Sequence, residues 1–266
     1  MSDHENEYFR EQFLRSFSDM SLLIDRDPYK FLAGLVGAFQ NRLNTDPSVK
    51  PQLHFFAAAM EAVSVRFSAL DRWAAAFPSA CVNANVDLGK RQEQHQILFD
   101  FFCNAWASVE SFCCGGYFIG SVLHPVNFAF GIPQSGQLTK LKKITPKETL
   151  GSYNTFEPRA AFTSQLQAFW DSDEYKLIRD MRMLLEHRMV PGRTILVQAP
   201  NASHSIDLDI WYDGDVYRLY GGSFPPTRRM FELDDNCLSR QRDWLDVSIH
   251  DLSEKLGQLA ATKGLV

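Results

Sequence analysis

The 266-residue sequence lacks the motifs with which most enzymes bind phosphate or metal ions. It contains no G-x-x-x-x-G-K-[ST] loop, no strand-linked G-x-G-x-x-G, no H-E-x-x-H and no G-x-S-x-G. Its seven histidines are scattered, and no group of them has the spacing of a metal site. We therefore expect no metal site and no organic cofactor, so any chemistry would rest on side chains alone.

The sequence also lacks paired cysteines, a leader and long apolar runs. It has five cysteines, an odd number, and none of them forms a C-x-x-C pair. This pattern is typical of reduced thiols in a reducing compartment. The N-terminus is acidic and polar, unlike a signal peptide. The longest apolar stretch, Cys113 to Val122, is too short to cross a bilayer. These absences predict a cytoplasmic protein with no membrane partner.

Excess positive charge is missing as well. The formal net charge is -5, whereas proteins that coat nucleic acids are usually basic because they neutralise phosphates. A local basic site for one RNA strand remains compatible with this charge. Apolar residues make up 45% of the chain and include 21 phenylalanines, which predicts a sizeable packed core.

The spacing of apolar residues predicts a mainly α-helical chain. Helices are expected over residues 5–17, 28–43, 51–77, 90–123, 159–170, 172–189 and 234–262. Pro78 should end the third of these, and residues 125–155 should be irregular because they are rich in proline and glycine. Alternating polarity around Asp213-Gly214 predicts a small β-hairpin at about 205–221.

No linker or internal repeat divides the sequence. We therefore expect a single domain over residues 1–266, with a core bundle over about 28–195. The hairpin at 205–221 would be an insertion near the C-terminus, and the last helix, 234–262, would complete the domain.

One segment carries a motif with a known resemblance. Arg182, four further residues, His187 and Arg188 resemble the R-x4–6-H motif that the HEPN superfamily has near the end of a long bundle helix. The resemblance covers roughly residues 91–195. The surrounding sequence is also similar to that family in the lead-in from Ile178 to Arg182, the exit at Pro191-Gly192 and the preceding helix with Trp106, Glu110 and Phe112.

The resemblance implies a HEPN-like helical bundle that forms a homodimer. Many HEPN proteins are metal-independent RNases, often toxins of toxin–antitoxin or phage-defence systems, and others are inactive binding or scaffold modules. RNA would then be the substrate and an antitoxin the partner protein.

An active protein would divide the chemistry between two residues. His187 would act as general base on a ribose 2′-hydroxyl or as acid on the leaving oxygen, because an unperturbed imidazole titrates near neutrality. Arg182 would stabilise the charge on the phosphate with its planar guanidinium. The resemblance makes Arg188, Glu186 and Glu110 candidate substrate-binding residues.

A purely structural interpretation of the same residues stays open. Arg182 and His187 lie about 140° apart on an ideal helix, so they do not share one face of an intact helix. Arg182 lies at the margin of the apolar stripe, where it needs a carboxylate, and Glu186 at i+4 is the nearest candidate, with Glu110 as a second one. If that pair were buried, loss of Arg182 would cost about 3–5 kcal/mol.

The residue after Arg182 bears on the choice between functions. HEPN proteins usually have a polar residue there, often Asn, whereas this chain has Met183. The alternatives are therefore a catalytically inactive HEPN-like module that binds nucleotide or another protein, or an unrelated helical protein that binds an apolar ligand. Met183 favours the inactive module over the RNase.

Overall fold

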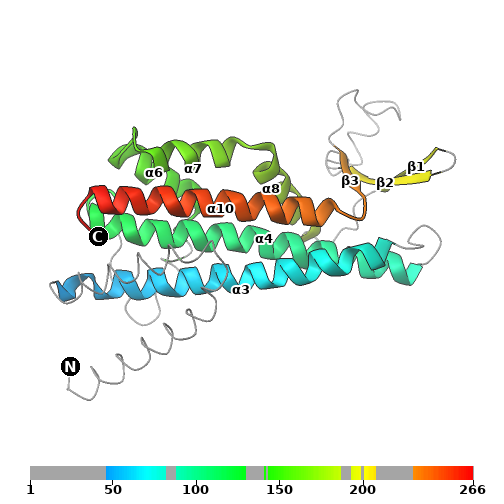
Figure 1. Cartoon of the computed structure of the whole chain (residues 1–266), viewed down its shortest axis with the longest axis horizontal. Coiled ribbons are helices and arrows are strands. Elements are labelled where there is room, and N and C mark those ends of the chain that lie inside the picture. The colour runs from blue at the N-terminus through cyan, green and yellow to red at the C-terminus, as the bar shows by residue number, and fades with distance from the viewer. Residues whose placement is uncertain are drawn as a thin grey trace, which may run out of the picture. The chain divides into compact units, whose positions relative to one another are not determined.

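The computed structural model describes residues 46–81, 88–129, 141, 143–186, 193–198, 201–207 and 230–265. The protein is mainly α-helical, as the sequence predicts. Its three long helices are α3 (Lys50–Cys81), α4 (Leu88–Leu123) and α10 (Cys237–Thr262), drawn in Figure 1. A short 3-10 helix, η2 (Pro47–Val49), precedes α3. The expected helices over 5–17 and 28–43 lie outside the described residues.

Three shorter helices separate α4 from the C-terminal part of the chain. They are α6 (Pro146–Phe156), α7 (Ala161–Asp171) and α8 (Asp173–Glu186). The expected helices over 159–170 and 172–189 correspond to α7 and α8, and residues 187–189 lie outside the described residues. The helix expected over 234–262 corresponds to α10, which begins three residues later.

The chain divides into two compact units. The first consists of Met1–Arg66, Ala107–Asp171 and Leu245–Val266, and the second of Phe67–Trp106 and Ser172–Trp244. Helices α3, α4 and α10 each contribute residues to both units. This division does not decide between one domain and two, so the single domain over 1–266 stays a prediction.

Helix α4 has the buried face that its apolar spacing predicts. Residues three, four and seven apart lie on one side of a helix, and that side is buried from Ile97 to Phe112. Each of the following is at most 3% exposed: Ile97, Leu98, Phe101, Phe102, Ala105, Val109 and Phe112.

The first unit packs around the C-terminal half of α4. From α6, the Tyr153 hydroxyl donates to the Gly116 carbonyl at 2.7 Å, and the Thr149 hydroxyl donates to the Cys113 carbonyl at 3.1 Å. From α3, the Phe55 ring stacks on Phe118 with centroids 5.0 Å apart. Aromatic packing and buried side-chain hydrogen bonds therefore hold α3 and α6 against α4.

The second unit joins α10 to two other helices through polar contacts. Arg242 Nε donates to Asp71 Oδ1 on α3 at 2.8 Å, and both side chains are about one quarter exposed. Gln241 Nε2 donates to the Glu174 carbonyl of α8 at 3.5 Å. These contacts anchor the first turns of α10 beside α3 and α8.

The second unit also contains a three-stranded antiparallel sheet, β1-β2-β3 (Figure 1). The strands are β1 (Arg193–Gln198), β2 (Asn201–Asp207) and β3 (Met230–Leu233). The register pairs Arg193 with Ile206 and Asp207 with Met230. Residues 205–207 of the expected hairpin belong to β2. Residues 208–221, with Asp213-Gly214, lie outside the described residues, so that hairpin stays a prediction.

Two sequence-based helix boundaries are wrong. Pro78 does not end α3, which continues to Cys81. A proline removes one backbone hydrogen bond of the helix, and only three residues of α3 follow Pro78. Residues 125–155 are not irregular throughout, because α6 begins at Pro146. Thr145 caps α6 by accepting from the Glu148 backbone N–H at 3.2 Å.

Candidate functional site

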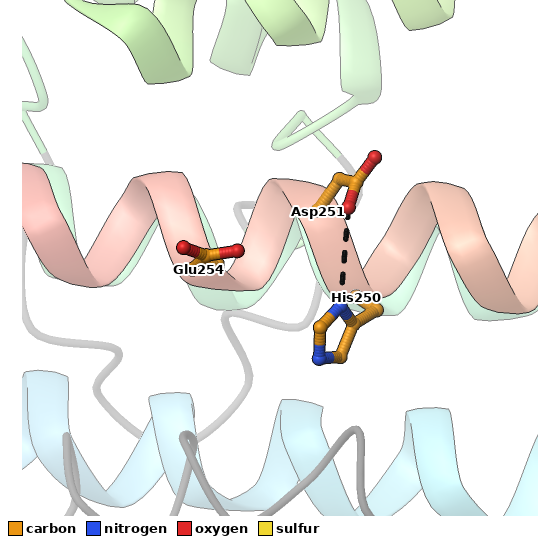
Figure 2. Close-up of side chains that lie close together, drawn as sticks. All are labelled: His250, Asp251 and Glu254. Carbon is orange, nitrogen blue, oxygen red and sulfur yellow. Dashed lines mark ion pairs between the residues drawn. The ribbon is translucent and has the colours of Figure 1, made fainter.

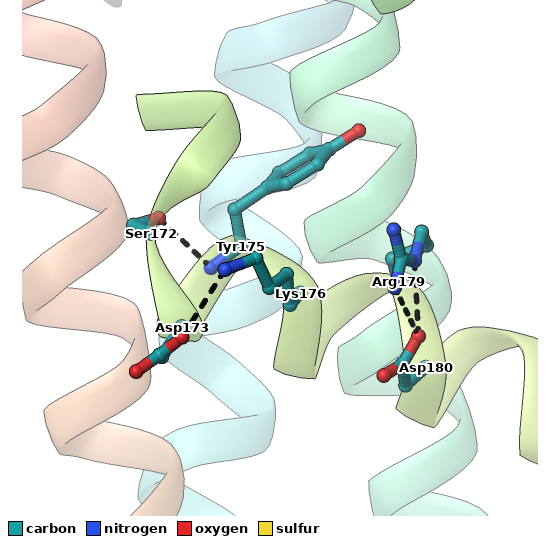
Figure 3. Close-up of polar contacts among 6 residues, drawn as sticks. All are labelled: Ser172, Asp173, Tyr175, Lys176, Arg179 and Asp180. Atoms are coloured by element: carbon teal, nitrogen blue, oxygen red, sulfur yellow. Dashed lines mark hydrogen bonds and ion pairs between the residues drawn. The ribbon is translucent and has the colours of Figure 1, made fainter. Parts of the chain in front are cut away.

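Helix α8, which carries the R-x4–6-H motif, is fixed at its start by capping contacts. The Ser172 hydroxyl accepts from the Tyr175 backbone N–H at 3.2 Å, as expected of an N-cap. Lys176 Nζ lies 3.3 Å from Asp173 Oδ1 one turn later (Figure 3). The acidic residues Asp173 and Glu174 also favour the positive end of the helix dipole. The sequence alone therefore defines where this helix begins.

The middle of α8 holds a buried carboxylate. Asp180 is 8% exposed, and its Oδ1 accepts from both Nε and Nη2 of Arg179 at 2.9 Å (Figure 3). A carboxylate at this depth requires such partners, because an unpaired buried charge is costly. The Arg179–Asp180 pair thus contributes to the stability of the helix that presents Arg182.

Arg182 lies in the last described turn of α8 and makes two contacts with other described residues. Its Nη2 is 2.8 Å from Glu186 Oε1, at the i+4 spacing expected from the sequence. Its Cζ lies over the Trp106 ring of α4, 5.8 Å from the ring centroid. The side chains of Arg182 and Glu186 are 35% and 40% exposed, so the guanidinium is held in place but remains open to solvent.

The Trp106 ring lies directly under the Arg182 guanidinium. Its ring stacks on Tyr175 of α8 with centroids 5.8 Å apart and an interplanar angle of 29°. Its indole N–H is buried and has no acceptor among the described residues. The Trp106 ring therefore contacts two residues of α8, Tyr175 and Arg182, which are seven positions apart.

Cys103 lies one turn before Trp106, and the charges of Glu186 and Arg182 both affect the pKa of its thiol. Burial, followed by the negative charge of Glu186, raises the pKa of the Cys103 thiol to about 11, and the Arg182 guanidinium acts in the opposite direction. A thiol with so high a pKa is a poor nucleophile at neutral pH. Cys103, Trp106, Arg182 and Glu186 are referred to below as the Arg182 cluster.

Only part of the expected site is brought together. Arg182 and Glu186 form the predicted ion pair. Glu110 is exposed on α4 and belongs to the first compact unit, and the ion pair that the structure gives Arg182 is with Glu186. His187 and Arg188 lie outside the described residues, so their roles remain predictions.

Sequence reasoning missed two members of the Arg182 cluster. Trp106 was expected in a core helix, without a contact to Arg182, and Cys103 was expected to be only a reduced thiol. Their i, i+3 spacing on α4 was a usable signal, because residues three apart share a helix face. Pairing that face with α8 requires tertiary information.

A second group of polar side chains lies on α10. His250, Asp251 and Glu254 place one ligand atom each within 4.8 Å of one another, and His250 Nδ1 is 3.9 Å from Asp251 Oδ1 (Figure 2). This is the one group of three potential metal ligands among the described residues, and its i, i+1, i+4 spacing matches none of the usual metal-binding motifs. All three donors come from one helix surface, and the two carboxylates with one imidazole define no preference for a particular metal.

Two helical segments are long and apolar enough to cross a membrane by length and composition. They are Pro51–Cys81 and Gly89–Leu123, each with a window of mean hydropathy 1.2. The windows are 44% and 50% buried inside the protein, and core helices of soluble proteins pass the same test. Two such helices are weak evidence for a membrane, and the cytoplasmic location stays a prediction.

Comparison with known proteins gives no independent assignment. No protein-family model, curated protein or solved structure matches the chain. The motif and the geometry of the Arg182 cluster are therefore the two observations that bear on function.

Proposed function

We propose that this protein is a HEPN-like, metal-independent RNase that acts on single-stranded RNA, of the kind found in toxin or defence systems. The observation that supports this most is the state of Arg182. Its guanidinium is fixed by Glu186 and Trp106 yet 35% exposed, and His187 follows Glu186 directly in the sequence. Phosphoryl chemistry on RNA requires a fixed cation to stabilise charge on the phosphate, which Arg182 can supply, and a general base, for which His187 is the candidate.

In the proposed reaction the His187 imidazole takes the proton of a ribose 2′-hydroxyl. The 2′ oxygen attacks the adjacent phosphorus, the bond from phosphorus to the 5′ oxygen breaks, and water protonates that leaving oxygen. The products are a 2′,3′-cyclic phosphate and a 5′-hydroxyl. Arg182 stabilises the charge that accumulates on the phosphorus oxygens, and Arg188 adds a second cation for the neighbouring phosphate.

Glu186 does not have to leave for Arg182 to act. A guanidinium carries five N–H donors, and the ion pair with Glu186 is made through Nη2. The remaining donors can meet a phosphate oxygen. Glu186 is then a positioning residue that orients the guanidinium, in place of the substrate-binding role that the resemblance implies.

The same ion pair also supports a second candidate function. A carboxylate 2.8 Å from the guanidinium competes with phosphate for it, and Met183 replaces the polar residue usual in active HEPN proteins. In this second proposal the protein is a catalytically inactive module that binds a nucleotide or a partner protein. Met183→Asn separates the two: cleavage gained by this variant and dependent on His187 would indicate a decayed active site.

The direct test is RNA cleavage in the presence of EDTA. The wild type should cut a labelled single-stranded RNA, and His187→Ala should not. The control is His250→Ala, which removes an exposed histidine of α10 and should leave cleavage unchanged. Absence of cleavage by the wild type would reject the RNase and leave the binding module. Equal cleavage by His187→Ala would reject His187 as the general base.

A further inference from the structure

The second half of α10, which belongs to the first unit, presents the group of His250, Asp251 and Glu254 to solvent (Figure 2). The opposite side of this helix is packed, since Ile249 and Leu252 are at most 2% exposed. A buried face of this kind fixes the rotation of a helix about its own axis. The three polar side chains are therefore carried by a backbone that is held in place.

The spacing of these three residues brings their side chains to one sector of the helix surface. At about 100° per residue, Glu254 lies about 40° from His250 and about 60° from Asp251. One ligand atom of each residue lies within 4.8 Å of those of the other two, and His250 Nδ1 is 3.9 Å from Asp251 Oδ1. The three donors thus converge although a single helix supplies them.

The donor atoms are close enough for side-chain rotation alone to complete a metal site. A transition-metal ion binds imidazole nitrogen and carboxylate oxygen at about 2.0–2.2 Å, so neighbouring ligand atoms in such a site are about 3–3.5 Å apart. The side chains of His250 and Asp251 are 47% and 49% exposed, so no packed neighbour prevents their rotation. Glu254 has a long, flexible side chain. An ion could therefore be bound without movement of the backbone.

The two carboxylates of this group have no lysine or arginine partner among the described residues. Asp251 pairs only with His250, and Glu254 accepts from the neutral amide of Gln258 at 3.0 Å. Lys255, four residues after Asp251, forms no ion pair with it in the described part of the chain. Two neighbouring negative charges repel each other, and a divalent cation bound between them would neutralise both.

We propose that His250, Asp251 and Glu254 bind one divalent ion of the first transition row, for which Zn²⁺ is the probe, and that water completes its coordination. The imidazole nitrogen selects against Mg²⁺ and Ca²⁺, which prefer oxygen ligands. This site goes beyond the proposed function, because Arg182 belongs to the second unit and the proposed cleavage needs no metal. It also replaces the sequence-based expectation of no metal site, since its spacing matches no usual motif.

The test is isothermal titration calorimetry of the full chain with ZnCl₂, after treatment with EDTA and removal of the chelator. The wild type should bind Zn²⁺ at micromolar concentration and Mg²⁺ far more weakly. His250→Ala and Glu254→Gln should each weaken Zn²⁺ binding by roughly tenfold or more. The matched controls are His54→Ala and Glu61→Gln, which remove an exposed histidine and an exposed carboxylate of α3 in the same unit and should bind as the wild type does.

Three outcomes would overturn the site. They are no Zn²⁺ binding by the wild type, unchanged binding by both variants, and equal affinity of the wild type for Mg²⁺. Glu254→Gln keeps the size of the side chain, and it decides the question if His250→Ala changes the helix content measured by circular dichroism. RNA cleavage in EDTA is measured without the ion, so its result is independent of this site.

Discussion

At the scale of single residues, Arg182 is held by an exposed ion pair and an aromatic ring. A pair buried at the margin of the core would have made Arg182 worth about 3–5 kcal/mol to stability. The observed exposures of 35% and 40% lower that expectation, because solvent screens such a pair. The Arg182 side chain is thus accessible to solvent, and its ion pair should contribute little to the stability of the fold.

We therefore expect Arg182→Ala to lower the free energy of unfolding by only about 0.5–1 kcal/mol, measured by urea denaturation. Arg179→Ala is the matched control, since it removes the neighbouring arginine and weakens the pairing of the buried Asp180. That variant should lose about 1–3 kcal/mol. A larger loss for Arg182→Ala than for Arg179→Ala would contradict this account of the two pairs.

Cys103 reports on the charge of Glu186. The pKa of its thiol is raised to about 11 by burial first and by the Glu186 carboxylate second. Glu186→Gln removes that negative charge, which makes the thiolate easier to form, so the pKa should fall. Burial persists, and the pKa should stay above the ordinary thiol value.

The measurement is the pH dependence of iodoacetamide labelling, with Cys103 followed by peptide mass spectrometry. Cys114 is an internal control, because burial and the charge of Glu110 raise its pKa to about 11. Glu186→Gln should move the Cys103 profile to lower pH and leave the Cys114 profile unchanged. Equal shifts at both cysteines would indicate a general loosening of the fold.

At the scale of elements, two glycines of α4 permit close packing of the first unit. A methyl group at Gly120 would meet the ring of Phe128, and one at Gly115 would meet the flexible end of Met60. A side-chain methyl can rotate away, whereas a packed ring has to shift as a whole. Gly151, in α6, has no neighbour near an added methyl.

Three alanine substitutions should therefore have different effects on stability. Gly120→Ala should lower the free energy of unfolding by about 1–3 kcal/mol, and Gly115→Ala by less than about 1 kcal/mol. Gly151→Ala should raise it by about 0.5–1 kcal/mol, because alanine favours the helix. Thermal or urea denaturation gives the order, and a stabilising Gly120→Ala would refute the packing argument.

The sequence predicts elements best where spacing is long and regular. The buried face of α4 and the Ser172 cap of α8 could both be identified, since each depends on neighbours in sequence. Helix α6 was missed although Thr145-Pro146 and Glu148 have the pattern of a helix start, because nearby glycines and prolines outweighed it. The α4 side of the Arg182 cluster is a tertiary contact, which no local pattern encodes.

Strand β1 was also not predicted from the sequence. The run Thr194-Ile195-Leu196-Val197 favours a strand by composition, but it does not alternate in polarity. Periodicity therefore gave no prediction for residues 193–204, whereas the structure pairs β1 with β2. Val247 is the converse case, because it is an apolar residue of the helix predicted over 234–262 and is nevertheless 62% exposed.

At the scale of the whole molecule, the HEPN resemblance predicts a homodimer with the region from Arg182 to His187 at or near the interface. The 140° separation of these two residues on an ideal helix favours a site completed by another element or subunit. Light scattering at micromolar concentration should give about twice the mass of 30.3 kDa. A monomer at that concentration would count against a shared site.

The proposed reaction is cleavage of RNA by Arg182 and His187 through attack of a 2′-hydroxyl, without a metal ion. The most direct measurement is the chemistry of the product ends after digestion of single-stranded RNA in EDTA. We expect 2′,3′-cyclic phosphates and 5′-hydroxyls from the wild type, and no cleavage by His187→Ala at an unchanged melting temperature. Products with 3′-hydroxyl ends, or cleavage that only a divalent cation restores, would contradict it.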